Sequence, residues 1–133
     1  MSKPVPTVQE FMTAQPLTIA PGAPLAEAAR IMRERSIRHL PVVEEGRLVG
    51  ALSERDVHVA RTLRSVTLET TKVETLMNDR PLAVPASAAL PDVAARMIDR
   101  KAGSAIVMHD GCVVGIFTTH DALHALHRLL AGA

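Results

Sequence analysis

The chain has 133 residues, of which 47% are hydrophobic and 2% aromatic, and its formal net charge at pH 7 is +1. This length supports one packed domain, whereas each half alone would be marginal, so we expect the two halves to share one core. The near-neutral charge gives no field to attract DNA or an anionic membrane, and without Trp or Tyr the chain lacks the usual stacking platforms for single-stranded nucleic acid. We therefore expect neither nucleic acid nor a membrane as a partner.

The remaining features of the sequence bear on disulfides, location and catalysis. One cysteine cannot form an internal disulfide, and the position of Cys112 beside a predicted turn favours an ordinary exposed thiol. The N-terminal segment lacks the apolar run of a signal peptide, and no stretch has the apolar length that a bilayer demands, so we expect a cytoplasmic protein. Neither a P-loop nor a nucleophile with an orienting base is present, so we expect no catalysis and no required cofactor.

An internal repeat organises the chain. Residues 8–56 align without a gap with residues 73–121, and 14 of the 49 aligned positions are identical. We therefore divide the chain into two repeats, residues 1–66 and residues 67–133.

In chain order, each repeat predicts a strand, a helix, two strands and a helix, which is an α/β (α+β) fold of two pseudo-symmetric halves. The first short strand is expected at Thr18-Ile19 and at Ala83-Val84. The first helix follows from apolar residues at the spacing of one buried helix face, namely Leu25, Ala28, Ala29 and Met32, matched by Leu90, Val93, Ala94 and Met97. Strands at 40–43 and 47–50 flank a turn, and Asp110-Gly111 gives the stronger hairpin signal in the second copy.

The last helix of each repeat is expected over about 55–64 and about 120–130, with residues 65–72 as the connection between the repeats. In the second of these helices we expect Leu123, Leu126 and Leu130 to form the buried side.

The segments Ser53-Glu-Arg-Asp56 and Thr118-Thr-His-Asp121 occupy matched positions where a strand ends and a helix begins. One interpretation is a capping box, in which a hydroxyl and an acidic side chain satisfy free backbone N–H groups. The alternative is a nucleotide site, because a helix N-terminus attracts phosphate and a nearby carboxylate can accept from both hydroxyls of a ribose. Two copies of the pattern, each behind a strand that contains glycine, favour the nucleotide.

The order and duplication of these motifs resemble a tandem pair of CBS domains, often called a Bateman module. The matching segments are residues 11–13, 37–43 and 46–56, and in the second copy residues 103–107 and 111–121. The resemblance implies a regulatory module that binds AMP, ADP or ATP in a cleft between the two halves and commonly forms a homodimer. Some relatives bind S-adenosylmethionine, NAD or cyclic dinucleotides instead.

The resemblance also implies which residues hold the ligand. The first site comprises Thr18, Ile19, Ile37, Arg38, His39, Leu40, Pro41, Ser53, Arg55 and Asp56. The second comprises Ala83, Val84, Gly103, Ser104, Ala105, Ile106, Thr118, His120 and Asp121. Asp56 and Asp121 are expected to hold ribose hydroxyls. Because the second copy has no arginine matching Arg38 or Arg55, we expect the first site to prefer ligands with more phosphate.

Two alternatives stay open. The pair could serve as a ligand-free scaffold for oligomerisation, with both acidic segments acting as caps alone. His120, His124 and His127 recur at i, i+4 and i+7 on the last helix, a spacing that could hold Zn²⁺ or Ni²⁺, although a solvated helix face is the preferred interpretation and no metal site is predicted. No output domain is recognised in this sequence, so we expect the regulated target to be a separate, unidentified protein.

Overall fold

The computed structural model describes residues 4–132, which form two compact units. The middle unit is Leu17–Pro81, and the terminal unit combines the residues up to Pro16 with those from Leu82 onwards. The compact units and the sequence repeats therefore divide the chain at different places. The division into repeats 1–66 and 67–133 stays a prediction about the duplication.

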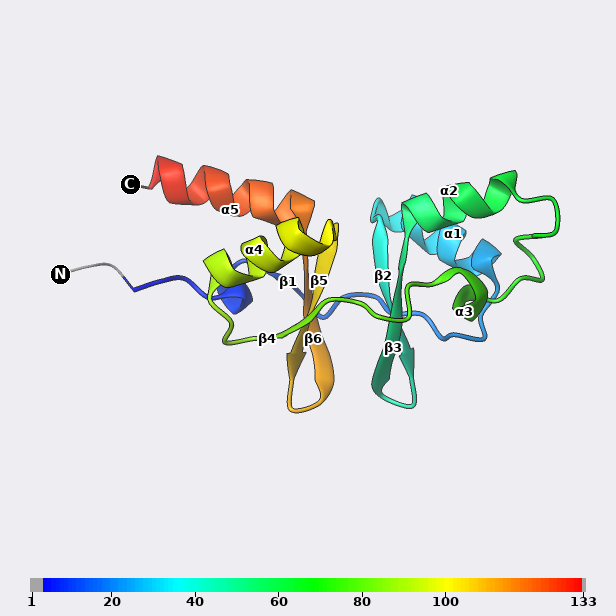
Figure 1. The fold of residues 1–133 in the computed structure, drawn as a ribbon, viewed down its shortest axis with the longest axis horizontal. Helices are drawn as coiled ribbons and strands as arrows, with labels where there is room; N and C mark the ends of the chain where they lie inside the picture. Colours follow the sequence, from blue (N-terminus) through cyan, green and yellow to red (C-terminus); the bar gives the residue numbers. More distant parts are fainter. Residues whose placement is uncertain (1–3, 133) are drawn as a thin grey trace. The chain divides into compact units, whose positions relative to one another are not determined.

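The middle unit packs three helices against a two-stranded hairpin (Figure 1). Its elements are α1 (Leu25–Arg35), β2 (His39–Glu44), β3 (Arg47–Ser53), α2 (Glu54–Thr62) and α3 (Val73–Leu76). Strands β2 and β3 are antiparallel, and Glu45 and Gly46 join them with φ values of 50° and 78°. Two consecutive positive φ angles are the requirement of the tight turn whose twist matches the flanking strands.

The terminal unit contains a four-stranded sheet in the order β1-β6-β5-β4. Its elements are the short 3-10 helix η1 (Val8–Glu10), β1 (Thr13–Ala14), β4 (Ala83–Pro85), α4 (Leu90–Arg100), β5 (Ser104–His109), β6 (Cys112–Thr118) and α5 (Thr119–Ala131). Strand β4 runs parallel to β5, while β1 and β5 are antiparallel to β6. The predicted turn at Asp110-Gly111 is confirmed, with φ values of 50° and 78°. Among the described helices, none has the length and apolarity needed to cross a bilayer.

The short strand predicted at Ala83-Val84 is confirmed as β4, but the one predicted at Thr18-Ile19 is wrong. Ile19 forms a single parallel bridge with Val42. In the terminal unit, two more hydrogen bonds extend the pairing of β4 with β5: the N–H of Ile106 donates to the carbonyl of Leu82, and the N–H of Ala86 donates to the carbonyl of Met108. The matched positions in the first repeat, 41 and 21, are both proline. Proline has no N–H to donate, so the ladder cannot extend beyond Ile19.

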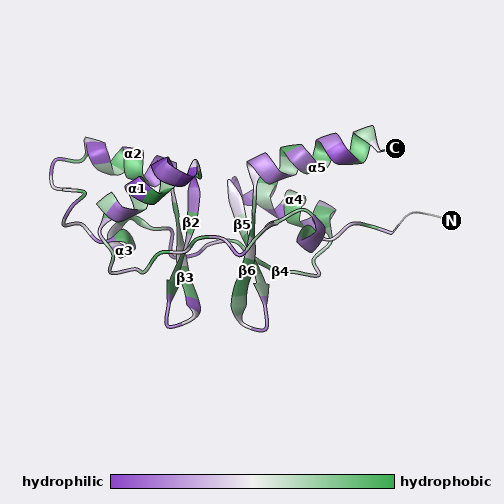
Figure 2. Cartoon of the chain, turned by 180° about the vertical axis from the view of Figure 1, so that it is seen from behind, coloured by the Kyte–Doolittle hydropathy of each residue, from purple (hydrophilic) through white to green (hydrophobic). Residues whose placement is uncertain are grey.

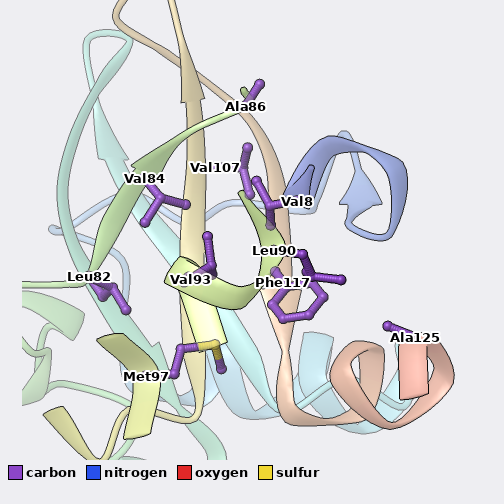
Figure 3. Packing of buried hydrophobic residues seen from close by; sticks show 11 residues of the cluster. Val8, Leu82, Val84, Ala86, Leu90, Val93, Met97, Val107, Phe117 and Ala125 are labelled. Atoms are coloured by element: carbon purple, nitrogen blue, oxygen red, sulfur yellow. The ribbon is translucent and has the colours of Figure 1, made fainter. Parts of the chain in front are cut away.

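The expectation of one shared core is wrong, because the buried apolar residues form two clusters, one in each unit. Figure 3 shows the cluster of the terminal unit, where Val8 from the start of the first repeat packs with Phe117 and Val107. Reciprocally, Val73 from the start of the second repeat belongs to the cluster of the middle unit. Each unit thus completes its core with a segment from the other repeat, which compensates for its small size.

The buried faces predicted for the first helix of each repeat are confirmed at Leu25, Ala28 and Met32 and at Leu90, Val93 and Met97. The predicted buried side of α5 is wrong. Leu123 and Leu130 are 64% and 70% exposed, and the helix packs on its unit through the small residue Ala125, which is 3% exposed. Figure 2 shows apolar and polar stretches alternating along α5. The structure therefore leaves an apolar leucine surface uncovered on this helix.

A glycine–methionine contact recurs in both units. A Cβ atom at Gly50 would lie 2.5 Å from Sδ of Met77 and 2.9 Å from the backbone oxygen of Asn78. A Cβ atom at Gly115 would collide with the side chain of Met12. The matched glycines are therefore positions where the opening segment of the other repeat approaches the strand closely.

Candidate functional site

In the middle unit, the three segments predicted to form the first site lie together. Ile19 donates to the carbonyl of Pro41 at 3.0 Å and accepts from Val43 at 2.9 Å, so the 18–19 segment lies along β2. His39 and Ser53 are opposite each other at the end of the β2–β3 hairpin. This pairing places the start of β2 beside the start of α2, and it brings all ten predicted residues of the first site into one unit.

Asp56 belongs to a complete capping box at the start of α2. Its Oδ2 accepts from the backbone N–H of Ser53 at 2.8 Å, and its own N–H donates to Oγ of Ser53 at 3.1 Å. The capping interpretation is therefore confirmed. Within residues 4–132, the second carboxylate oxygen, Oδ1, accepts no hydrogen bond, so Asp56 keeps one acceptor available after its capping role is fulfilled.

The helix N-terminus itself offers fewer free donors than the sequence indicated. Glu54 donates its N–H to the carbonyl of Arg38 at 2.8 Å, and the N–H of Asp56 is taken by Ser53. Of the first three N–H groups of α2, the part of the chain that the structure describes leaves only that of Arg55 without an acceptor. Binding of an anion at this end of the helix therefore depends more on charged side chains than on backbone N–H groups.

That charge is available from two arginines. Arg38 and Arg55 are both exposed, and neither forms an ion pair with any described residue. The hydrogen bond from Glu54 N–H to Arg38 carbonyl fixes the backbone of one arginine beside the first turn that carries the other. Two unpaired guanidinium groups held by adjacent backbone segments are suited to binding phosphate.

Several predicted residues present little side-chain surface, so only their backbone is available to a ligand. Their side chains are buried in the structure, namely Ile19, Leu40 and Pro41 in the middle unit and Val84, Ala105 and Ile106 in the terminal unit. Ile37 and His39 are partly buried, Thr18 and Arg38 are exposed, and Gly103 and Ser104 are partly buried. The exposed and polar groups of both sets are therefore the ones that can discriminate between ligands.

The terminal unit assembles the second predicted set in the same way. Ala83 and Val84 pair with Ile106 and Val107, and Ser104 lies opposite Thr118. Thr119 donates its N–H to the carbonyl of Gly103 at 3.1 Å, which repeats the contact between Glu54 and Arg38. The capping box is also repeated: Oδ2 of Asp121 accepts from the N–H of Thr118 at 2.9 Å.

The two carboxylates differ in their second oxygen. Oδ1 of Asp121 accepts a hydrogen bond from Oγ1 of Thr13 at 3.0 Å. The position matched to Thr13 is Asn78, whose side-chain oxygen instead accepts from the backbone N–H of Arg80 at 3.0 Å. Sequence reasoning missed Thr13. Its signal was its place in the family-matched segment 11–13, directly after the repeat-matched Met12, and nothing in the sequence links it to Asp121.

A pocket of about 530 Å³ lies elsewhere in the terminal unit, between residues 83–87 and the hairpin residues 108–110, with Gln9 at its edge. It includes Ala83 and Val84 but neither Thr118, which ends β6, nor Asp121, which lies in the first turn of α5. Its lining contains no arginine or lysine to bind phosphate. We therefore give more weight to the capped helix ends than to this pocket as ligand sites.

Comparison with known proteins identifies the same two repeats. The family model described as CBS domain matches residues 8–61 and again residues 73–128. The CBS domain-containing protein YhcV of Bacillus subtilis is 27% identical over 96% of this chain and 91% of its own length. The L-aspartate semialdehyde sulfurtransferase of Methanocaldococcus jannaschii is 31% identical over 99% of this chain, but this chain spans only about 25% of that enzyme. The match to the enzyme is therefore partial.

Solved structures share the fold over nearly the whole chain. A putative acetoin utilization protein (AcuB) from Vibrio cholerae has a TM-score of 0.85 and 29% identity, covering 96% of this chain and 95% of that one. The CBS domain pair of protein MJ0100, in complex with 5′-methylthioadenosine and S-adenosyl-L-methionine, has a TM-score of 0.85 and 26% identity, covering 93% and 98%. CBSX2 in complex with AMP has a TM-score of 0.80 and 26% identity, covering 92% and 97%. Adenosine-containing ligands thus occur in two of these structures.

Proposed function

Since the chain belongs to the CBS-domain family and carries two such domains, we propose that it is a regulatory module that binds adenosine nucleotides of the AMP, ADP or ATP type and acts on a separate partner protein. The observation that carries the proposal is Asp56. One of its carboxylate oxygens is held by the backbone of Ser53, and the other accepts no hydrogen bond from the described residues. A carboxylate fixed in this way is pre-organised to accept from ribose hydroxyls.

The phosphate end of the ligand is assigned to Arg38 and Arg55. Both are exposed, and neither is neutralised by an acidic partner among the described residues. Charge-assisted hydrogen bonds from guanidinium groups are about twice as strong as neutral ones, so these side chains favour the ligand with more phosphate.

The terminal unit is proposed as a weaker or differently selective site. His120 stands at the position matched to Arg55, and Gly103 at the position matched to Arg38. In addition, Asp121 has already accepted a hydrogen bond from Thr13. The missing arginines reduce its capacity for a polyphosphate, and the hydrogen bond from Thr13 competes with ribose hydroxyls for Asp121. We propose that this site binds a less charged adenosine ligand or none.

A thermal-shift panel tests the proposal directly. The purified chain is melted with AMP, ADP, ATP, S-adenosylmethionine, NAD and cyclic dinucleotides over a range of concentrations. A ligand that binds only the folded state raises the melting temperature progressively with its concentration. We expect at least one adenosine nucleotide to do so, and guanosine nucleotides of equal charge to be inactive. Equal shifts with adenosine and guanosine nucleotides would indicate nonspecific anion binding and refute the proposal.

We also propose that the module is a homodimer that uses the exposed leucine surface of α5, which consists of Leu123, Leu126, Leu129 and Leu130. Val59 on α2 and Leu63, the residue directly after this helix, are exposed as well. Neighbouring exposed leucines on one helix are typical of a surface that is covered by a partner.

The competing function is a scaffold that dimerises without binding a ligand. The observation that favours it is the completeness of both capping boxes, since capping alone explains why Ser53, Asp56, Thr118 and Asp121 are present. The two functions differ in one result: a scaffold shows no thermal shift with any nucleotide while remaining dimeric.

A further inference from the structure

The first turns of α5 carry two histidines whose ring nitrogens meet. Nε2 of His120 and Nε2 of His124 are 3.2 Å apart, with ring centroids at 4.7 Å and ring planes at 84°. Both side chains are exposed. From this geometry we propose that His120 and His124 form a binding site for a divalent transition-metal ion such as Ni²⁺, Cu²⁺ or Zn²⁺.

The separation of the two nitrogens matches the bite of a metal ion. Zn–N bonds of about 2.0–2.1 Å that meet at a tetrahedral angle place two nitrogens about 3.3 Å apart. In the absence of metal, one neutral ring can donate its Nε2 proton to the lone pair of the other. To bind a metal ion through both Nε2 atoms, the donating ring shifts its proton from Nε2 to Nδ1 by exchange with water, and each neutral ring then offers the metal one Nε2 lone pair.

Helical geometry maintains this arrangement. Residues at i and i+4 lie one above the other on the same face of a helix, which is the spacing that zinc-binding helices use for paired histidines. The backbone at this point is anchored by the capping box of Thr118 and Asp121 and by the burial of Ala125. The histidines are therefore attached to a fixed part of the helix.

The two histidines provide only part of a coordination shell. Among the described residues, no group of three or more His, Cys, Asp or Glu side chains gathers closely enough to hold an ion. Water therefore occupies the remaining positions, as it does in open metal sites. Imidazole ligands select Ni²⁺, Cu²⁺ and Zn²⁺ over Mg²⁺, which requires oxygen ligands.

This inference does not depend on nucleotide binding, although His120 belongs to the second predicted nucleotide site. Its test therefore uses nucleotide-free protein without an affinity tag. Titration calorimetry with NiCl₂, ZnCl₂ and MgCl₂ is expected to show one Ni²⁺ or Zn²⁺ ion bound per chain and no Mg²⁺ binding. His120→Ala and His124→Ala are each expected to weaken Ni²⁺ and Zn²⁺ binding at least tenfold, because each removes one of the two protein ligands.

His127→Ala is the matched control, because it removes an exposed histidine from the same helix without altering the 3.2 Å pair. It is expected to change affinity less than threefold. Circular dichroism identifies any variant that loses helix, and His124→Gln then replaces His124→Ala. Absence of Ni²⁺ and Zn²⁺ binding, or a larger loss in His127→Ala than in His120→Ala, would overturn the proposal.

Discussion

Thr13 and Asp121 are 108 residues apart in the sequence, and Oγ1 of Thr13 donates to Oδ1 of Asp121 at 3.0 Å. The same two segments are connected a second time, because the guanidinium carbon of Arg128 lies 4.8 Å from the centroid of the Phe11 ring. The opening segment of the chain is thus attached to α5 by a hydrogen bond and a cation–π contact. This attachment distinguishes the acidic residue of the terminal unit from its counterpart, Asp56.

Removing the hydroxyl of Thr13 tests that attachment. Thr13→Val is expected to lower the free energy of unfolding by about 0.5–1 kcal/mol, a small effect because the threonine is exposed. Thr13→Ser keeps the hydroxyl and is expected to retain most of the stability. Urea denaturation of the three proteins measures the difference. Equal destabilisation by both substitutions would show that the hydrogen bond contributes nothing.

The two glycine–methionine contacts predict that alanine substitution destabilises the fold to different extents at Gly50 and Gly115. At Gly50 an added Cβ meets the backbone oxygen of Asn78 as well as Met77, whereas at Gly115 it meets only the flexible side chain of Met12 among its three nearest atoms. Gly50→Ala is therefore expected to destabilise by about 1–3 kcal/mol, and Gly115→Ala by less.

A double-mutant cycle checks the mechanism of this effect. Met12→Ala, which opens space beside Gly115, is expected to offset the Gly115→Ala penalty. Met77→Ala is expected to offset the Gly50→Ala penalty only in part, since the Asn78 carbonyl stays in place. Strict additivity in both cycles would contradict the steric explanation.

Charge at matched positions 55 and 120 is expected to set phosphate preference. Arg55→His copies the second repeat into the first and should weaken ATP binding about tenfold, with a smaller effect on AMP. Titration calorimetry with both nucleotides measures this, and Arg61→His, at an exposed position in the last turn of α2, is the control. Equal losses for AMP and ATP would contradict a contact between Arg55 and the β- or γ-phosphate of ATP.

The leucine surface of α5 predicts a dimer that one charge can dissociate. Sedimentation of the native chain should give about twice 14.3 kDa. Leu126 is 54% exposed in the single chain. A glutamate at this position would place an unpaired charge in the dimer interface, so Leu126→Glu should sediment as a monomer. Leu17→Glu, at a position 42% exposed and outside α5, should remain dimeric. A native monomer at tens of micromolar would refute the dimer.

Local sequence signals predicted much of the fold. The periodicity at Leu25, Ala28 and Met32 correctly gave a helix and its buried face, and Asp110-Gly111 correctly gave a hairpin turn. These elements depend on residues close together in the chain. Two predictions failed for local reasons. The strand predicted at Thr18-Ile19 did not take into account the prolines at positions 21 and 41, which have no N–H to donate. The leucines of α5 have helical periodicity, but periodicity does not show whether the face that carries them is covered.

Long-range features could not be predicted in this way. Val8 and Val73 complete the core of the unit that contains most of the other repeat, and a duplicated pattern gives no indication of which copy each opening segment joins. The capping boxes were predicted from their spacing, but the hydrogen bonding of the second carboxylate oxygen was not. Oδ1 of Asp121 accepts from Thr13, which is 108 residues away in the sequence, whereas the matched residue Asn78 accepts from the nearby N–H of Arg80 instead.

The most direct test of the proposed function compares Asp56→Asn with Asp121→Asn. An asparagine oxygen can still accept from the N–H of Ser53 or Thr118, so both caps are retained. The second oxygen, however, is replaced by an NH₂ group that cannot accept from a ribose hydroxyl. With AMP in titration calorimetry, well below the melting temperature of each variant, Asp56→Asn is expected to lose at least tenfold in affinity, or about 1.4 kcal/mol, and Asp121→Asn less than threefold. Unchanged AMP affinity in folded Asp56→Asn would contradict the assignment of the ribose site to Asp56.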